Sequence, residues 1–491
     1  MKKTILTLLV VCTLAFAGYG QGPAQKYIER QLKTDSLFNN AIIGIMAVNA
    51  DGEVIAEWNS NLPMLTASTM KTITTGVGLN LLGPDFKFST KVAYSGEITE
   101  GVLNGDIYII GGGDPTLGSS DKVAFSIDSI FGIWCNGLEK AGIRKIRGNI
   151  IADDSYFTRE LIPETWCWGD IGADYGSGTS GLCFHENTQE FALTPGKSVG
   201  DSVKIEIIYP AVPGQKIIND VTTGEAKSGD RSRYYLDNIT TTTVYRGSVA
   251  ADKREVRSVN SNSFPHLSCA WHFGEFLSKE GIEVEGEIKD IKDMKDVNGA
   301  QEEAGRTVVA ETFSPELIEI INVTNRISNN LYAETIFKTI GKVATGVGSY
   351  DSARVALCRE LEKMGVDRYG FTQADGSGLS RENYVSPRFF CNYYTAMEKS
   401  DDFSLFLESL PVPGKYGTLS SVLKGEPDSL KSRIHAKSGS LSSVRCYAGY
   451  VEEKEKNGLI KFAILTNNYA AKTSQMQPKI EGFLKALAIE K

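Results

Sequence analysis

Apolar runs near both ends of the chain predict strands and helices that belong to one layered α/β unit. Residues 41–58 are expected to form two strands, because an Asp-Gly turn between apolar runs is a strong hairpin signal. A buried, largely apolar helix is predicted from about Ser68. Residues 444–450 and 460–466 are rich in strand-forming side chains, and 473–489 follow a helical pattern. We therefore expect both ends of the chain to contribute to the same unit.

The middle of the chain carries a different pattern. A helix that ends at a glycine and continues as an extended segment is predicted at 138–143, 277–282 and 361–366. The first two of these segments indicate paired βα units. Residues 186–250 are rich in Thr, Val, Ile and Tyr without a helical period, which predicts an all-β piece. The charged, glycine-containing stretch 290–306 is typical of a linker back to the first unit.

Composition narrows the class of protein without naming a function. The chain has 491 residues, of which 41% are hydrophobic and 23% charged, so it is globular and long enough for about three domains. The formal net charge of −8 disfavours binding to nucleic acid. The sequence contains only four histidines, which argues against a histidine-rich metal centre.

The first residues are predicted to be an export signal. Two lysines precede an apolar run over residues 5–16, and a small-x-small pattern ends at Ala17. We expect cleavage there or a few residues later, because the run is too short to span a membrane and Cys12 lies in a poor lipoprotein box. Seven cysteines remain after cleavage, an odd count that does not indicate a disulfide framework. One bridge is possible, and Cys167 and Cys183 are the nearest pair. The mature protein is expected to be exported and soluble, without a transmembrane segment.

A Ser-x-x-Lys sequence opens the predicted apolar helix. The spacing places the Ser68 hydroxyl and the Lys71 amine on one helical face, where the lysine can act as the base that a serine nucleophile requires. Burial and a second cation lower the pKa of a lysine, and the N-terminus of a helix favours a developing oxyanion. The same pattern also arises by chance, since Ser119 and Lys122 repeat it in this chain.

A Ser-x-Asn sequence precedes another predicted helix. From a loop, the Ser328 hydroxyl and the Asn330 amide can point into one cleft, where one relays a proton and the other binds a substrate amide. The alternative interpretation is structural, with Ser328 as the N-cap of the helix and Asn325 or Asn329 in support.

A Lys-Ser-Gly sequence lies in a predicted strand near the C-terminus. Strand alternation puts Lys437 and Gly439 on one side and Ser438 on the other. The lysine supplies a cation for a carboxylate and also lowers the pKa of a neighbouring lysine such as Lys71, and the glycine permits close approach of a substrate backbone. The alternative is an edge strand that carries a protective lysine.

The order of the three motifs resembles the active-site set of the penicillin-binding proteins and serine β-lactamases. Two flanking segments, 108–117 and 375–381, sharpen this resemblance. Over almost the whole mature chain, the sequence is similar to the D-alanyl-D-alanine carboxypeptidase/endopeptidase family, the class C low-molecular-mass penicillin-binding proteins or S13 peptidases. That family usually has Lys-Thr-Gly as its third motif, and Ser438 keeps the hydroxyl.

The resemblance implies a multi-domain α/β fold. A transpeptidase-like catalytic unit, a sheet flanked by helices, is interrupted by a large inserted α/β unit that itself carries a nested β-rich unit. The long separation of Ser68 from Ser328 fits such an insertion. We expect a signal peptide at 1–20, the catalytic unit at 21–95 and 305–491, the inserted unit at 96–185 and 251–304, and the nested unit at 186–250.

Carried over residue by residue, the resemblance also implies roles for the motif residues. Ser68 is the acylated nucleophile and Lys71 its base, while Ser328 is the proton relay and Asn330 the contact to the substrate amide. The backbone N–H groups of Ser68 and Ser440 form the oxyanion hole.

Further residues are implied to bind the substrate. Lys437 and Ser438 bind its terminal carboxylate. Asp375 and Arg381 match a family segment near the cleft, with turn and surface roles as the alternative. Asp170 corresponds more loosely to an acid of the inserted unit that reaches the stem-peptide amine in relatives, and a surface aspartate is its alternative.

Other chemistry-bearing patterns are weaker. His266, Cys269 and His272 have a spacing that can hold a metal, but they fall in an apolar helical pattern. His435 is a candidate for a Ser-His-Asp triad, which a lysine base makes unnecessary. Glu100 begins a Glu-x-x-Leu-Asn string like the deacylation loop of class A β-lactamases, but it lies too soon after the nucleophile and is predicted to be a turn.

The leading hypothesis is a peptidoglycan DD-peptidase that acts through an acyl-enzyme. It would cleave D-Ala-D-Ala termini, D-Ala-diaminopimelate cross-links or both, and β-lactams would inhibit it covalently. The alternatives are a serine β-lactamase and a catalytically silent cell-wall binding protein. We expect peptidoglycan stem peptides as partners, no nucleic acid, no metal, no cofactor, and a periplasmic or cell-envelope location.

Overall fold

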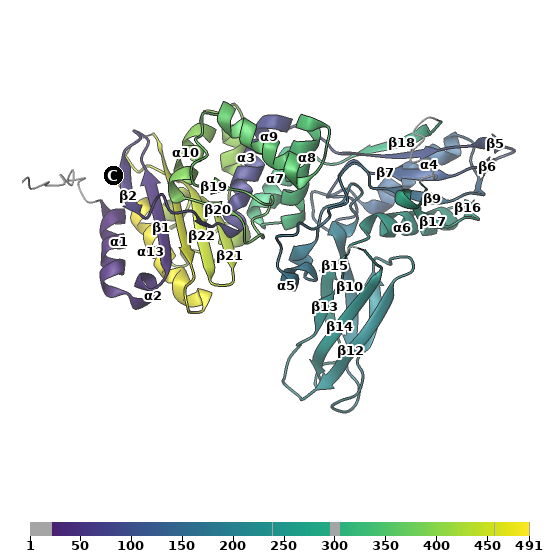
Figure 1. Ribbon diagram of the computed structural model, residues 1–491, viewed down its shortest axis with the longest axis horizontal. Coiled ribbons are helices and arrows are strands. Elements are labelled where there is room, and N and C mark those ends of the chain that lie inside the picture. The colour runs from purple at the N-terminus through teal and green to yellow at the C-terminus, as the bar shows by residue number, and fades with distance from the viewer. Residues whose placement is uncertain (1–21, 238, 295–304, 456, 491) are drawn as a thin grey trace, which may run out of the picture.

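A mixed core of sheet and helices occupies one end of the molecule (Figure 1). The computed structural model describes residues 22–237, 239–294, 305–455 and 457–490. Within them an antiparallel sheet has the strand order β2 (Val54–Trp58), β1 (Ile42–Val48), β23 (Leu459–Asn467), β22 (Val444–Glu452) and β21 (Ile434–Leu441). The predicted N-terminal hairpin and C-terminal strands are confirmed, and chain segments from both ends pair directly.

Both faces of this sheet are covered, which explains why its central strands are apolar almost throughout. On one face, side chains such as Ile464 of β23 pack against a layer made of α1 (Pro23–Thr34), α2 (Ser36–Asn39) and α13 (Thr473–Ala488). On the other face, the next residue, Leu465, belongs to a larger core with the remaining helices. Those helices are α3 (Lys71–Leu82), α7 (Leu317–Arg326), α8 (Asn330–Thr345), α9 (Tyr350–Lys363), α10 (Pro387–Met397) and α11 (Phe403–Ser409).

Shorter elements connect this layer to the sheet. The helix predicted from Ser68 begins as the 3-10 turn η1 (Ala67–Met70) and continues directly as α3. A small sheet of β3 (Met64–Leu65), β20 (Tyr384–Val385) and β19 (Phe371–Thr372) lies beside it, and the turn η5 (Gly417–Leu419) and helix α12 (Asp428–Lys431) precede β21.

The opposite end of the molecule is a second α/β unit (Figure 1). Its larger sheet has the order β17 (Ile288–Asp290), β9 (Ile150–Asp153), β7 (Ile107–Ile110), β4 (Ser89–Tyr94) and β18 (Thr307–Phe313). A smaller sheet has the order β16 (Glu283–Val284), β8 (Lys145–Ile146), β6 (Val102–Asn104) and β5 (Glu97–Thr99). Helices α4 (Ile127–Lys140) and α6 (Pro265–Lys279) cover the core.

The helix-then-strand segments predicted in this unit are confirmed. After α4 and α6 the chain reverses at Gly142 and Gly281, with φ of 85° and 83°, a conformation that favours glycine. The strands that follow, β8 and β16, pair in parallel with each other. Such parallel pairing needs a long crossover, which the two helices provide.

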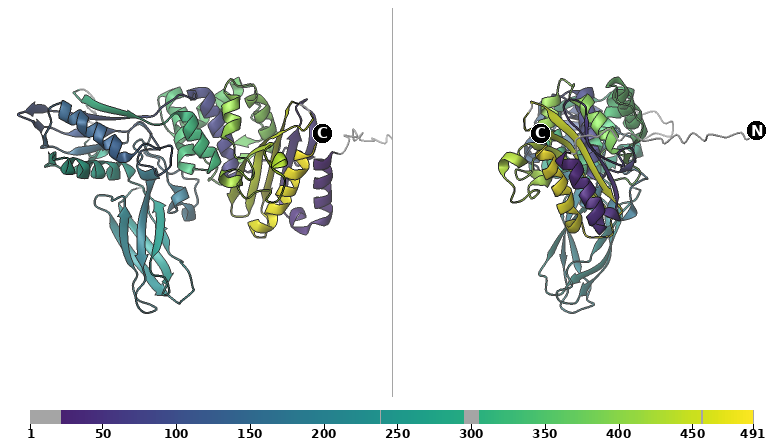
Figure 2. Two further views of the ribbon diagram at one scale, coloured as in Figure 1. Left: turned by 180° about the vertical axis from the view of Figure 1, so that it is seen from behind. Right: turned by 90° about the vertical axis from the view of Figure 1, so that its left-hand side faces the viewer.

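A narrow β unit projects away from the long axis of the molecule, downward in Figures 1 and 2. Its strands are β10 (Thr188–Thr194), β11 (Lys204–Tyr209), β12 (Lys216–Gly224), β13 (Arg233–Tyr235), β14 (Thr242–Ala250) and β15 (Val256–Ser261). Phe191, Tyr234 and Tyr245 form the centre of its small core. The predicted all-β stretch is therefore confirmed, and it continues as far as Ser261.

The insertion leaves and rejoins the first unit at adjacent positions, since Tyr94 of β4 pairs with Thr307 of β18. Both strands hydrogen-bond into the sheet of the second unit and not into the sheet that contains β21. We therefore propose that the inserted unit spans about residues 89–313 and the nested unit 188–261, a few residues beyond the expected limits.

Several expectations about the rest of the chain have partial answers. The export signal and Cys12 lie outside the described residues, as does most of the predicted linker, which begins with β17 and the turn η4 (Ile291–Met294). Of the helices that are described, none has the length and apolarity to cross a bilayer.

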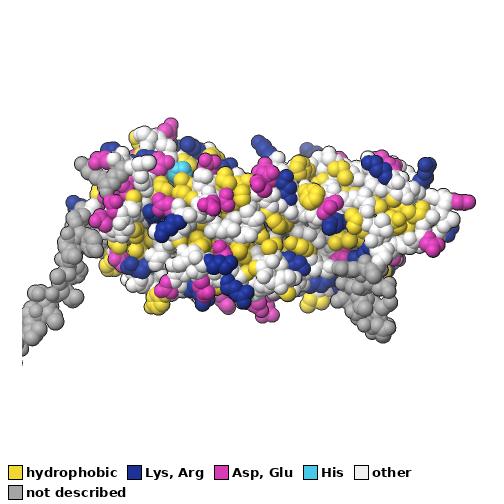
Figure 3. All heavy atoms as spheres, turned by 90° about the horizontal axis from the view of Figure 1, so that it is seen from above, with side chains coloured by type: hydrophobic (Ala, Val, Ile, Leu, Met, Phe, Trp, Pro, Cys, Tyr) yellow, Lys and Arg dark blue, Asp and Glu magenta, His cyan; other side chains and the backbone are white. Residues whose placement is uncertain are grey.

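Cys167 is exposed and Cys183 buried, and both are free, so the candidate disulfide is not formed. Acidic and basic side chains are interspersed along the upper face (Figure 3).

Candidate active site

The three sequence motifs meet at one cavity where β21, the turn η1 and the helical layer come together. The cavity has a volume of about 530 Å³. Its lining consists of Ser68, Asp170, Tyr175, Ser328, Asn330, Gly378, Leu379, Arg381, Thr418, Ser438, Ser440, Leu441, Ser442 and Arg445. Residues from the first, second and third motifs therefore face a common space.

Ser68 is presented by a tight turn that glycine allows to form. Ala67, just before it, has a left-handed φ of 45°, which is uncommon for a residue with a side chain. A Cβ atom on Gly439 would lie 2.9 Å from the Ser68 nitrogen and 2.6 Å from the Thr66 oxygen. The glycine of the third motif thus makes room for the chain's own backbone, whereas the sequence predicted room for substrate backbone.

Lys71 is the centre of the hydrogen-bond network. Its Nζ lies 3.0 Å from Ser68 Oγ, 2.6 Å from Asn330 Oδ1 and 2.8 Å from the Ser377 oxygen. The side chain is fully buried, and burial lowers the pKa of its amine to about 7, although the negative charges of Glu334 and Asp375 oppose the change. At neutral pH a large fraction of the amine is therefore unprotonated and can accept the Ser68 proton.

A buried carboxylate fixes the loop that contacts Lys71. Glu334 of α8 accepts hydrogen bonds from the backbone N–H groups of Gly376 and Ser377 at 3.0 and 2.7 Å. These bonds orient the Ser377 carbonyl toward Lys71. Burial and the neighbouring charge of Asp375 raise the pKa of Glu334.

The second motif reaches the cavity because its middle residue caps the helix. Asn329 Oδ1 accepts from the Tyr332 N–H at 3.0 Å, so the N-cap is Asn329 and the alternative of a cap at Ser328 is wrong. Ser328 has a left-handed φ of 67°, and its hydroxyl is left for the active site. Asn330 accepts from Lys71 and donates through Nδ2 to the Tyr175 oxygen at 2.7 Å.

Lys437 joins the third motif to the second. Its Nζ donates to Ser328 Oγ and to the Ser438 carbonyl, each at 2.9 Å. The side chain has no exposed surface, and burial together with the charges of Lys71 and Arg445 holds the pKa of Lys437 well below its usual range. Ser438 points its hydroxyl at Thr418, with 3.0 Å between the two oxygens.

The remaining predicted binding residues separate into two groups. Asp170 and Arg381 line the cavity, and Asp170 accepts from the Tyr175 hydroxyl at 2.9 Å. Asp375 is fully buried beneath the cavity and accepts from Trp166, Gly378, Ser380 and Asn383. The resemblance implied a substrate contact at Asp375, with a turn role as the alternative, and the geometry fits the alternative: Asp375 shapes the loop and ties it to the inserted unit.

Sequence reasoning missed several residues of the site, some in the cavity lining and one buried behind it. Arg445 is a lone cation in the otherwise apolar strand β22, and that contrast was a usable signal. Glu334 likewise interrupts the apolar face of a helix. Thr418 and Tyr175 lie in short turns whose position depends on the tertiary fold, and no local pattern marks them.

The competing chemical interpretations find no support in the geometry. His435 hydrogen-bonds Glu452 and does not line the cavity, as a triad histidine would. Glu100 lies in the turn between β5 and β6, at the far end of the molecule from β21 (Figure 1). His266 contacts Asp290, and His272 accepts from the Ala211 N–H, so these two rings have separate structural partners.

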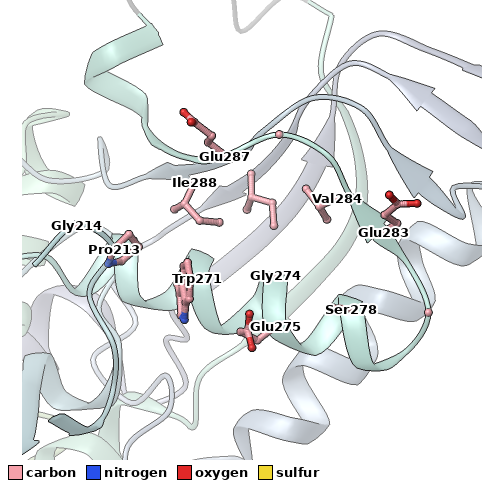
Figure 4. A pocket seen from close by; sticks show the side chains of 13 residues that line it. Pro213, Gly214, Trp271, Gly274, Glu275, Ser278, Glu283, Val284, Glu287 and Ile288 are labelled. Carbon is pink, nitrogen blue, oxygen red and sulfur yellow. The ribbon is translucent and has the colours of Figure 1, made fainter. Parts of the chain in front are cut away.

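A larger cavity of about 960 Å³ lies on the inserted unit, between α6 and the segment that leads into β17 (Figure 4). Trp271 and Glu275 project into it from the helix, opposite Val284 and Ile288. Of the residues that line it, none is a lysine, histidine or cysteine that would activate Ser278. The cavity at Ser68 is therefore the better candidate for covalent chemistry.

Comparisons with known proteins point to one family. The profile of the D-Ala-D-Ala carboxypeptidase 3 (S13) family matches residues 24–487. A D-alanyl-D-alanine carboxypeptidase of Actinomadura sp. (strain R39) is 28% identical over 449 residues, which cover 89% of this chain and 79% of the relative.

Solved structures show the same fold. Penicillin binding protein 4 of Haemophilus influenzae superposes with a TM-score of 0.80 at 23% identity, covering 94% of this chain and 98% of the other. The same protein complexed with a β-lactam superposes with a TM-score of 0.74 at 22% identity over the same shares of both chains.

Proposed function

The chain belongs to the D-Ala-D-Ala carboxypeptidase 3 (S13) family and is a penicillin-binding serine DD-peptidase, and we propose that it cleaves peptidoglycan stem peptides through an acyl-enzyme on Ser68. The observation that carries this assignment of the site is the contact of a buried, weakly basic Lys71 with Ser68 and Asn330. A serine beside an amine of this kind has the activation that nucleophilic catalysis requires.

In the acylation step, Lys71 Nζ takes the proton of Ser68 Oγ across 3.0 Å as the oxygen attacks the carbonyl carbon of the penultimate D-Ala. The carbonyl oxygen becomes an oxyanion, and the backbone N–H groups of Ser68 and Ser440 are the proposed donors to it. Ser440 lies next to Gly439, whose backbone packs against the Ser68 nitrogen. Because these two backbone segments lie close together, their N–H groups can serve as the two donors of one oxyanion hole.

Collapse of the tetrahedral intermediate breaks the peptide bond, and the leaving amine needs a proton. Ser328 Oγ is the proposed donor, and Lys437, at 2.9 Å from that oxygen, restores the proton. Asn330 holds Lys71 and is the proposed contact for the substrate amide. Water then hydrolyses the ester and regenerates Ser68.

Recognition groups surround this centre. Lys437 and Ser438 remain the predicted contacts for the terminal carboxylate, and Asp170 and Arg381 are proposed to bind the stem peptide because both line the cavity. β-Lactams carry a comparable carboxylate and acylate the same serine in this proposal. A serine β-lactamase would need a group that activates water for fast deacylation, and Glu100 is too remote to supply it.

We also propose that residues 1–20 are removed on export and that the enzyme works in the periplasm or cell envelope, where peptidoglycan lies. The signal-like N-terminus supports this location. Determination of the N-terminal residue of the secreted protein tests it, with cleavage expected near Ala17.

The decisive test of the reaction is incubation with purified muropeptides followed by mass analysis of the products. Loss of a single terminal D-Ala from monomers identifies carboxypeptidase activity, and conversion of cross-linked dimers to monomers identifies endopeptidase activity. A Ser68→Ala variant should produce neither change. Unaltered muropeptides with the wild-type enzyme would contradict the proposal and favour a silent binding protein.

A further inference from the structure

Arg445 is a cation fixed at the edge of the active-site cavity. It lies on β22 directly opposite Ser440 of β21, and both residues line the cavity that contains Ser68. Val444 and Cys446 belong to the core shared with the helical layer, so strand alternation places Arg445 on the α13 face of the sheet, beside Tyr447. It nevertheless lines the cavity, because β22 lies next to the edge strand β21 there. Of the described residues of β22, only Arg445 lines the cavity.

Neutral groups hold this guanidinium in place. Its Nε donates to Gln477 Oε1 at 2.8 Å and its Nη2 to the Tyr447 hydroxyl at 2.6 Å. Gln477 is itself fixed, because its Nε2 donates to Glu481 at 2.8 Å and to Tyr447 at 2.9 Å. The arginine side chain is thus oriented by neutral partners, and the Glu481 carboxylate contacts Gln477 and not the guanidinium.

The missing counter-ion is the informative feature. Within the part of the chain that the structure describes, no carboxylate lies within salt-bridge distance of Arg445 and its Nη1 has no hydrogen-bond acceptor. Arg159 and Arg306, by contrast, donate to buried aspartates. An oriented but unpaired guanidinium that faces a cavity is suited to a carboxylate ligand, which it can bind through two parallel hydrogen bonds.

Lys437 is less suited to be the main anchor for that ligand. It is fully buried, is absent from the cavity lining, and already donates to Ser328 and to the Ser438 carbonyl. A carboxylate in the cavity would meet Arg445 directly, whereas it would feel Lys437 chiefly through its charge.

We propose that Arg445 binds the free α-carboxylate of the residue that leaves during cleavage. The inference rests on the proposed peptidase function and adds one residue, Arg445, that determines the preference for a free carboxylate. Ser438 and Thr418 line the same cavity and offer hydroxyl groups beside it. Gln477 is a positioning residue that aims the guanidinium.

The test compares a peptide ending in D-Ala-D-Ala with its C-terminal amide. In the wild-type enzyme the amide should lower kcat/KM by at least about thirtyfold, since the loss of one partner of a desolvated charge pair has an effect of this size. In Arg445→Gln, kcat/KM for the acid should fall by a similar factor and the preference for the acid should disappear. Arg246→Gln, at an exposed side chain of β14, is the matched control and should behave as wild type.

Arg381→Gln separates the two arginines of the cavity. It should retain the preference for the acid, even if binding of the stem peptide weakens. A preference that survives in Arg445→Gln and disappears in Arg381→Gln would overturn the proposal.

Acylation by penicillin and by its methyl ester gives a second readout that does not depend on peptide cleavage. The ester should acylate wild type more slowly than the acid does, and Arg445→Gln should react slowly but completely with both, which also shows that the variant is folded. Equal acid-to-ester ratios in the two enzymes would refute the role of Arg445. A wild type that is acylated but cleaves neither peptide would contradict only the proposed function.

Discussion

Lys437 Nζ lies 2.9 Å from Ser328 Oγ, although the two residues are 109 positions apart in the chain. With Lys71 at 3.0 Å from Ser68, the site therefore contains two Ser–Lys pairs, one in position to activate the nucleophile and one in position to serve the leaving group. The charge of Lys71 also lowers the pKa of Lys437. The two pairs are electrostatically linked as well as adjacent.

The Ser328–Lys437 pair should act as a unit. Ser328→Ala and Lys437→Ala are each expected to lower kcat by about 10²- to 10⁴-fold, the usual contribution of a positioned proton donor. The double variant should be little worse than Lys437→Ala, because each single change already breaks the relay. Steady-state kinetics on a D-Ala-D-Ala peptide measures the three effects. Additive losses would show that Ser328 and Lys437 act independently.

Penicillin should form a long-lived covalent adduct with Ser68. The reason is a competent nucleophile whose described neighbouring carboxylates already have hydrogen-bond donors: Glu334 accepts from two backbone N–H groups, Asp375 is buried beneath the cavity, and Asp170 accepts from the Tyr175 hydroxyl. Intact-protein mass spectrometry should show one added penicilloyl group in wild type and none in Ser68→Ala.

Ser278→Ala is a suitable control, because Ser278 lines the larger cavity of the inserted unit. This variant should be acylated normally. Rapid release of hydrolysed penicillin by the wild type would instead favour the β-lactamase interpretation.

Acylation should depend on pH through Lys71. Because the pKa of this lysine is lowered to about 7, the unprotonated amine that acts as base is depleted as the pH falls. The second-order rate of acylation should therefore rise with pH, reach half its maximum near pH 7 and fall about tenfold for each unit below that. Stopped-flow measurements from pH 5 to 9 test this. Lys71→Arg should remove acylation throughout, since a guanidinium stays protonated.

Parts of the catalytic and inserted units could be predicted from sequence because their signals are local. The Asp-Gly hairpin, the apolar strands β22 and β23 and the glycines after α4 and α6 are each encoded within a few residues. The three motifs were also recognisable, since fixed spacings such as Ser-x-x-Lys reflect helix geometry. That the three motifs meet at one cavity was implied by the resemblance to a known family and could not be derived from the spacing of each motif.

Features that depend on tertiary contacts escaped prediction. Gly439 is required by the backbone of the turn at Ser68, which is distant in sequence. The burial of Asp375 follows from donors such as Trp166, which belongs to the inserted unit. The pairing of β4 and β18 with inserted strands is likewise a choice between two sheets that no local pattern decides. Charged residues in apolar segments, as at Arg445 and Glu334, were the signals that remained unused.

The short contact between Lys71 Nζ and Asn330 Oδ1, 2.6 Å, predicts a change in the pH profile of Asn330→Asp. A carboxylate in contact with the lysine favours the ammonium form, so the pKa of Lys71 should rise from about 7 by about 1–3 units. At pH 7 the unprotonated fraction, and with it the acylation rate, should fall at least about fivefold and partly recover toward pH 9. Asn330→Ala, which adds no charge, should slow acylation without moving the midpoint upward. A midpoint that stays near pH 7 in Asn330→Asp would show that Lys71 is not the titrating base.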